Sequence, residues 1–138
     1  MNTKDLETSV SDSALRQIHV AIQLLQISEL ESAITLAAAA EGMMPATETP
    51  HLFSKLKLLA DGLPVSEPGA KGPNDYAVWL KHGEAVGKKF DRAVIAELEA
   101  IAMIARAVSK YSAVYGGITP QMGAFRDWAI NRIQAEAP

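Results

Sequence analysis

Apolar residues recur at steps of three and four along most of the chain, which is the spacing of a helix that buries one face. No long alternation of β-branched and polar residues occurs, so strand signals are nearly absent. The pattern predicts four main helices, at about 13–27, 29–41, 91–115 and 120–135. We therefore expect an all-α protein.

Capping residues mark the ends of these predicted helices. Ser28 followed by Glu31 is typical of a capping box at the start of the second helix, and Gly42 is a predicted left-handed C-cap at its end. Gly116 is expected to end the third helix. Thr119 is the expected N-cap of the last one.

Three of the helices show clear apolar stripes that we expect to form the core. Their members are Leu15, Ile18, Ile22 and Leu25; Val94, Leu98, Ile101, Ala105, Val108 and Ser112; and Met122, Phe125, Ala129 and Ile133. On the third helix, Glu99, Arg106 and Lys110 lie opposite the stripe and are expected to face water.

The middle of the chain interrupts this pattern. Two short helices are expected at about 50–60 and 74–82, separated by a loop rich in glycine and proline at 62–73. Short connections favour an up-and-down bundle of four main helices, with the two short helices inserted in the middle. We expect a flexible N-terminal segment over 1–12 and a single domain over 13–138.

Composition narrows the classes of protein that this chain could belong to. It has 138 residues, a net charge of −3 and no cysteine, which excludes disulfides, thiolate metal sites and a cysteine nucleophile. The first ten residues lack the pattern of a signal peptide, and no apolar stretch is long enough to span a bilayer. We expect a cytoplasmic protein that does not bind membranes.

The segment 74–92 carries the residues best suited to bind a ligand. Between positions 81 and 92 it holds four fixed positive charges, Lys81, Lys88, Lys89 and Arg92, and only two negative ones. Such a run can be a solvated face. It can also hold a phosphate, because a local basic patch matters more than net charge. Asn74, at the start of the segment, is a further polar candidate.

His82 is the candidate for acid–base chemistry, because an imidazole titrates near neutral pH. The simpler interpretation is that Lys81 and His82 are cations favoured at a helix C-terminus. The three histidines show no metal-binding spacing, so we expect neither a metal nor another cofactor.

Glu41 is unusual because it continues the inward face of the second helix and also lies in its last turn, where the helix dipole disfavours an acid. It either reaches out to water or pairs with a cation. The candidate partners are Arg16, Lys81, His82 and Arg106.

The small-residue-rich segment 28–42, with Glu41 near its end, resembles the second helix of HEPN-like proteins. The later order, with 51–56, a loop, and Trp79 to His82 before two long helices, is similar to that family as well. The resemblance implies a bundle of four or five helices that forms a homodimer. Active members are metal-independent ribonucleases that pair an arginine with a histidine that follows it after four to six intervening residues.

In this comparison His82 matches the histidine, but the positions where the arginine is expected hold Asp75, Tyr76 and Ala77. We therefore hypothesise a non-catalytic, HEPN-like homodimeric module that binds a nucleotide, RNA or a partner protein through 74–92. One alternative is a metal-independent, toxin-like endoribonuclease that uses His82, with Lys81 or Arg92 holding phosphate. Another is a purely structural subunit.

Overall fold

The computed structural model describes residues 4–46, 73–85, 88–89, 92 and 94–136. Its elements are α1 (Val10–Gln26), α2 (Leu30–Met43), α4 (Pro73–His82), β1 (Glu84–Ala85), β2 (Lys88–Lys89), α5 (Glu97–Tyr115) and α6 (Pro120–Glu136). All four main helices and the short helix expected at 74–82 are therefore present. The helix expected at 50–60 and the loop at 62–72 lie outside the described residues.

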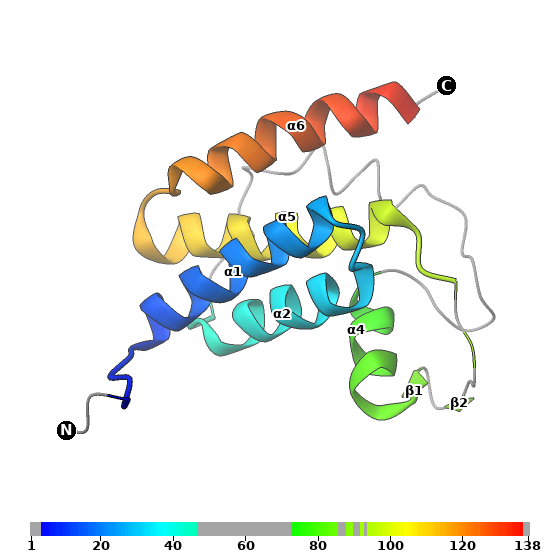
Figure 1. Ribbon diagram of the computed structural model, residues 1–138, viewed down its shortest axis with the longest axis horizontal. Coiled ribbons are helices and arrows are strands. Elements are labelled where there is room, and N and C mark those ends of the chain that lie inside the picture. Colours follow the sequence, from blue (N-terminus) through cyan, green and yellow to red (C-terminus); the bar gives the residue numbers. More distant parts are fainter. Residues whose placement is uncertain (1–3, 47–72, 86–87, 90–91, 93, 137–138) are drawn as a thin grey trace.

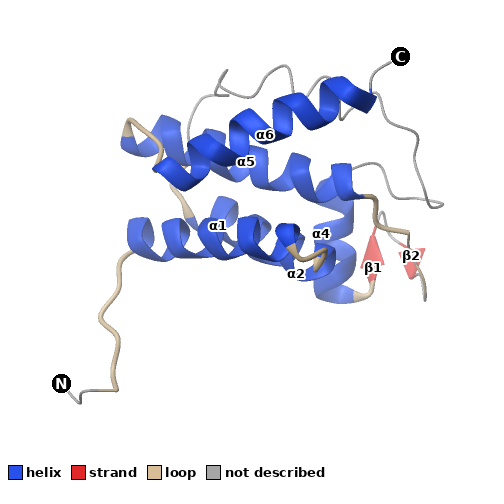
Figure 2. Cartoon of the chain, turned by 45° about the horizontal axis from the view of Figure 1, so that its top comes forward, coloured by secondary structure: helices blue, strands red, loops and turns tan. Residues whose placement is uncertain are grey.

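The helices pack as a bundle around α5 (Figure 1). Helices α1 and α2 form an antiparallel hairpin, and α5 packs against both. Helix α6 lies on α1 and α5, whereas α4 packs on α2 and α5 (Figure 2). The all-α bundle is thus confirmed. The chain direction does not alternate strictly, because α5 runs in the same direction as α2 after the central segment (Figure 1).

The core consists largely of the predicted stripes. Ile18, Ile22 and Leu25 of α1 are buried, as are all four stripe residues of α6, which are Met122, Phe125, Ala129 and Ile133. Helix α5 differs from the prediction in two ways. It begins at Glu97, so Val94 of the predicted stripe lies before the helix and is 60% exposed. In addition, residues 99–105 and 107–109 are all buried. A helix in contact with α1, α2, α4 and α6 has no broad solvent face. Glu99, expected to face water, is consequently only 8% exposed.

The predicted caps are right at α5 and α6 and wrong at α2. Gly116 ends α5 in the left-handed region with φ 79°, and Thr119 Oγ1 accepts a hydrogen bond of 3.2 Å from the Met122 N–H. Ser28 has φ 63° and forms the α1–α2 turn, so it cannot adopt the extended conformation of an N-cap. Gly42 lies inside α2, and the chain leaves the helix at Met44.

A two-residue antiparallel β ladder follows α4, with Glu84 opposite Lys89 and Ala85 opposite Lys88 in the backbone register. The sequence pattern did not predict it, because two residues are too few to show an alternation. Among the described helices, none is both long and apolar enough to cross a bilayer.

Candidate ligand-binding surface

Helix α4 is fixed to the bundle on one side and open on the other. Ala77 and Leu80 are partly buried and pack against the core, three residues apart and so on the same face. Lys81 and His82, in the last turn, are exposed. The helix therefore presents these two side chains to solvent from an anchored position.

The chain turns sharply after His82. The Gly83 N–H donates a hydrogen bond of 2.7 Å to the Trp79 carbonyl, which closes the last turn of α4. Gly83 has φ 73°, a left-handed conformation that glycine adopts without a steric penalty. This turn directs the chain into the β1–β2 ladder, and β1 packs beside α4.

The ladder pairs the backbone of Lys88 and Lys89 with β1, which packs beside α4 (Figure 2). We call Lys81, His82, Lys88 and Lys89 the basic tip. Two of these predicted site residues lie in the last turn of α4, and the backbone of the other two lies in the ladder that follows it.

Arg92 and Asn74, also predicted as site residues, are neither in the last turn of α4 nor in the ladder. Arg92 is exposed in the connection between β2 and α5. Asn74 lies in the first turn of α4, about 12 Å along the helix axis from His82 at 1.5 Å per residue. No described contact places Arg92 or Asn74 beside His82.

The described part of the chain shows few polar contacts around His82. A catalytic histidine normally has a second group that orients it and a cation or donor near the reacting phosphate. In the described part of the chain, no side chain forms a hydrogen bond or ion pair with His82 or Lys81. The exposed Lys81 and His82 side chains can attract and contact an anion.

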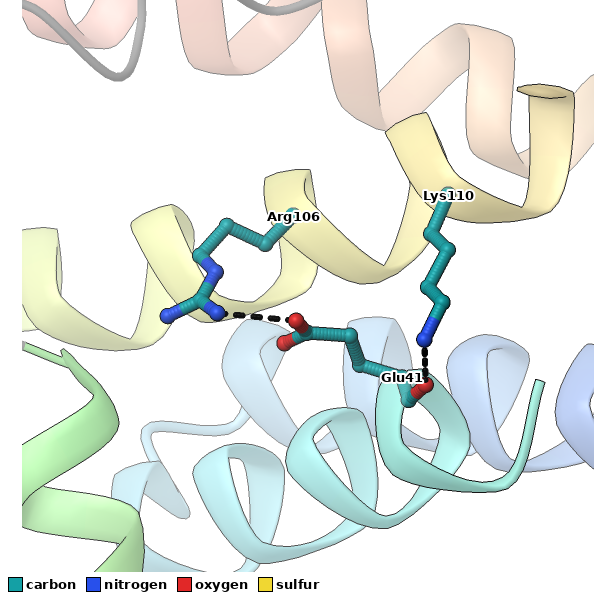
Figure 3. A network of polar contacts seen from close by, with 3 residues as sticks. All are labelled: Glu41, Arg106 and Lys110. Carbon is teal, nitrogen blue, oxygen red and sulfur yellow. Dashed lines mark hydrogen bonds and ion pairs between the residues drawn. The ribbon is translucent and has the colours of Figure 1, made fainter. Parts of the chain in front are cut away.

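Glu41 belongs to a separate polar network at the seam between α2 and α5 (Figure 3). Arg106 Nη2 donates to Glu41 Oε1 at 2.8 Å, and Lys110 Nζ donates to the Glu41 carbonyl oxygen at 2.7 Å. The side chains of Glu41 and Arg106 are 22% and 38% exposed. Of the two alternatives for Glu41, the structure shows the pairing with a cation, and the partner is Arg106.

This network corrects two expectations. Arg106 and Lys110 do not simply face water, because both reach across to the C-terminal end of α2. There Lys110 satisfies a terminal carbonyl and supplies a cation near the negative end of a helix with no basic residue in its own last turn. Glu41 is therefore held in a structural contact and is not part of the basic tip.

A second contact, which the sequence did not predict, links α1 to the start of α6. His19 Nε2 lies 2.7 Å from Thr119 Oγ1, the same oxygen that caps α6. Burial lowers the pKa of His19 below its ordinary value, because the charged imidazolium loses solvation. When Nε2 of the neutral imidazole carries no proton, the Thr119 hydroxyl can donate a hydrogen bond to it while its oxygen accepts one from the Met122 N–H. The partners are 100 residues apart, and no sequence pattern reports such a distant pair.

Within the described ranges, no group of three or more histidines or acidic residues could hold a metal ion. Comparisons with protein-family models, curated proteins and solved structures found no match for this chain.

Proposed function

We propose that this chain is a non-catalytic, HEPN-like helix-bundle module that forms a homodimer and binds a phosphate-bearing ligand, a nucleotide or nucleic acid, at its basic tip. The observation that carries the proposal is the exposure of Lys81 and His82 at the end of a helix whose other face is anchored in the bundle. An anchored helix holds its terminal cations at a defined place, which lowers the ordering cost of binding.

Electrostatics supports a phosphate as the ligand. The protein as a whole is acidic, with a net charge of −3, yet positions 81–92 contain four fixed cations and two acids. Phosphate groups are bound mainly by lysine and arginine, and the binding does not require a net positive protein. The negative end of the α4 dipole disfavours an anion on the helix axis, so the lysine side chains must supply the attraction.

The absence of an arginine at the HEPN-like positions before His82 supports the non-catalytic part of the proposal. One observation favours the alternative, an endoribonuclease: the His82 side chain is exposed next to Lys81 and is free to approach a substrate phosphate. In that mechanism His82 is the general base or acid, and Lys81 or Arg92 neutralises the phosphate.

A ribonuclease assay separates the two functions. Purified wild-type protein and the His82→Ala variant are incubated with mixed-sequence RNA in excess EDTA, and the products are separated by gel electrophoresis. The proposal predicts no cleavage by folded wild-type protein. Cleavage that disappears in His82→Ala would instead establish the endoribonuclease, because a contaminating nuclease would persist in both preparations.

A further inference from the structure

Helix α6 carries an exposed stripe without a single charged residue. Its members, spaced by three and four, are Gln121, Ala124, Trp128, Asn131 and Ala135, and each is exposed. Such spacing places the five side chains on one face of the helix. Trp128 is 45% exposed although it is a large apolar side chain. The centroid of its ring lies 6.4 Å from that of buried Phe125, so the Trp128 side chain packs against the core.

The charges that border this α6 stripe are already paired within the chain. Arg126 contacts Asp127 at 3.0 Å, and Arg132 contacts Glu97 at 2.9 Å. The stripe therefore offers little attraction to a nucleic acid or another highly charged partner. A surface that is equally free of charge fits it best, because no ion then has to give up its solvation on binding.

The stripe is also suited to pair with itself. Helix α6 runs from Pro120 to Glu136, so Trp128 lies at its midpoint. In an antiparallel pair of α6 helices, a two-fold axis through this point places Trp128 against its copy. It also places Ala124 near the copy of Asn131, and Gln121 near the copy of Ala135. Each small side chain then faces a larger one, as an interface between identical surfaces requires.

We infer that the α6 stripe binds a second copy of this chain in an antiparallel α6–α6 contact centred on Trp128. This inference rests on the homodimer in the proposed function and assigns its interface. One face of a 17-residue helix is a small contact area beside the roughly 800 Å² per partner of a standard interface, so we expect a weak dimer that dissociates on dilution.

Such a dimer leaves the ligand-binding surface open. In the described part of the chain, α4 makes no contact with α6, and the two helices lie on different sides of the bundle (Figure 1). Both copies of the basic tip stay accessible, and one dimer presents two sites to a single nucleic acid strand.

Sedimentation velocity over about 1–500 µM tests the interface with the full chain. Trp128→Glu introduces a charge at the centre of the stripe, and Ala124→Glu does so at a small exposed residue one helical turn away. We expect each change to weaken dimerisation by about tenfold or more. Val20→Glu is the matched control, because Val20 is 40% exposed on α1, outside the stripe. Circular dichroism verifies that each variant is folded.

The outcomes are distinct. A wild-type dimer that is lost in Ala124→Glu and Trp128→Glu and kept in Val20→Glu supports the interface. A wild-type dimer that persists in Ala124→Glu overturns the interface and leaves the homodimer standing. A wild-type monomer over the whole range overturns both the homodimer and the interface. It does not test phosphate binding, which is measured in a separate experiment.

Discussion

Two polar contacts, each between side chains far apart in the sequence, satisfy helix ends in this bundle. Arg106 and Lys110 of α5 bind the last turn of α2 through Glu41, and His19 of α1 binds Thr119 at the start of α6. Unpaired groups at helix ends are costly when they are shielded from water. Both contacts are therefore expected to matter for stability more than exposed ion pairs do.

Arg106→Ala should lower the free energy of unfolding by about 1 kcal/mol, because it leaves a partly buried carboxylate without its charged donor. Urea denaturation measures the change. A double-mutant cycle with Glu41→Ala should give a coupling energy of roughly 0.5–1 kcal/mol.

Arg126→Ala is the matched control, since Arg126 pairs with Asp127, which is 69% exposed. Its effect should stay within about 0.5 kcal/mol. An equal loss in both variants would show that the Glu41–Arg106 pair has no special role.

His19 should make stability depend on pH. Burial lowers its pKa in the folded state below the ordinary value of 6.5. Below that pH the unfolded chain binds a proton that the folded chain resists, so stability should decrease as the pH falls through 6.5. Above it the imidazole is neutral in both states and contributes no pH dependence.

Urea midpoints between pH 5 and pH 7.5 test this expectation in wild type and in His19→Gln, which keeps a hydrogen-bonding group but cannot titrate. The wild type should lose more stability than the variant as the pH is lowered. Parallel pH profiles for the two proteins would show that His19 is not responsible.

At the scale of elements, glycines with different backbone conformations should respond in opposite ways to the same substitution. Gly116 has φ 79° and ends α5, so Gly116→Ala should destabilise the protein by about 1–2 kcal/mol. Gly42 lies inside α2 with nothing within 4 Å of an added Cβ, so Gly42→Ala should stabilise by about 0.5–1 kcal/mol.

Gly117→Ala is the control for Gly116→Ala, because Gly117 has the same open surroundings without a positive φ. Thermal unfolding of the three variants should rank Gly42→Ala highest and Gly116→Ala lowest. A stabilising effect of Gly116→Ala would contradict the left-handed cap.

The helices themselves could be predicted from the sequence because each main helix buries a continuous stripe, such as Met122 to Ile133 on α6. Their exact ends were less predictable. The Ser28–Glu31 pattern suggested a capping box, but Ser28 is used to turn the chain between α1 and α2. Local patterns cannot report which of two competing roles the tertiary structure selects.

Burial of Glu99 was also missed, for a related reason. A stripe prediction assumes that a helix packs on one side, whereas α5 contacts four other helices. The partner of Glu41 was among the candidates named from the sequence, but choosing Arg106 required knowledge of how α2 lies along α5 (Figure 3).

At the scale of the whole molecule, the bundle separates two surfaces with different chemistry. The basic tip extends from the end of α4, and the uncharged stripe lies on α6. The sequence identified Lys81, His82, Lys88 and Lys89 as neighbours along the chain. The β1–β2 ladder, which pairs the backbone of Lys88 and Lys89 with the strand that follows His82, came only from the structure, because a two-residue ladder has no sequence signature.

The central claim is that the basic tip binds phosphate, and fluorescence anisotropy with a labelled, mixed-sequence RNA of about 20 nucleotides tests it most directly. The variants are Lys88→Glu with Lys89→Glu and, as a control with the same change in net charge, Lys4→Glu with Arg16→Glu, at exposed positions on the α1 side of the chain.

We predict saturable binding by wild type that weakens with added salt, a loss of about tenfold or more in the Lys88–Lys89 variant, and little loss in the control. Equal affinity of the Lys88–Lys89 variant and wild type, or no saturable binding by wild type, would contradict the claim.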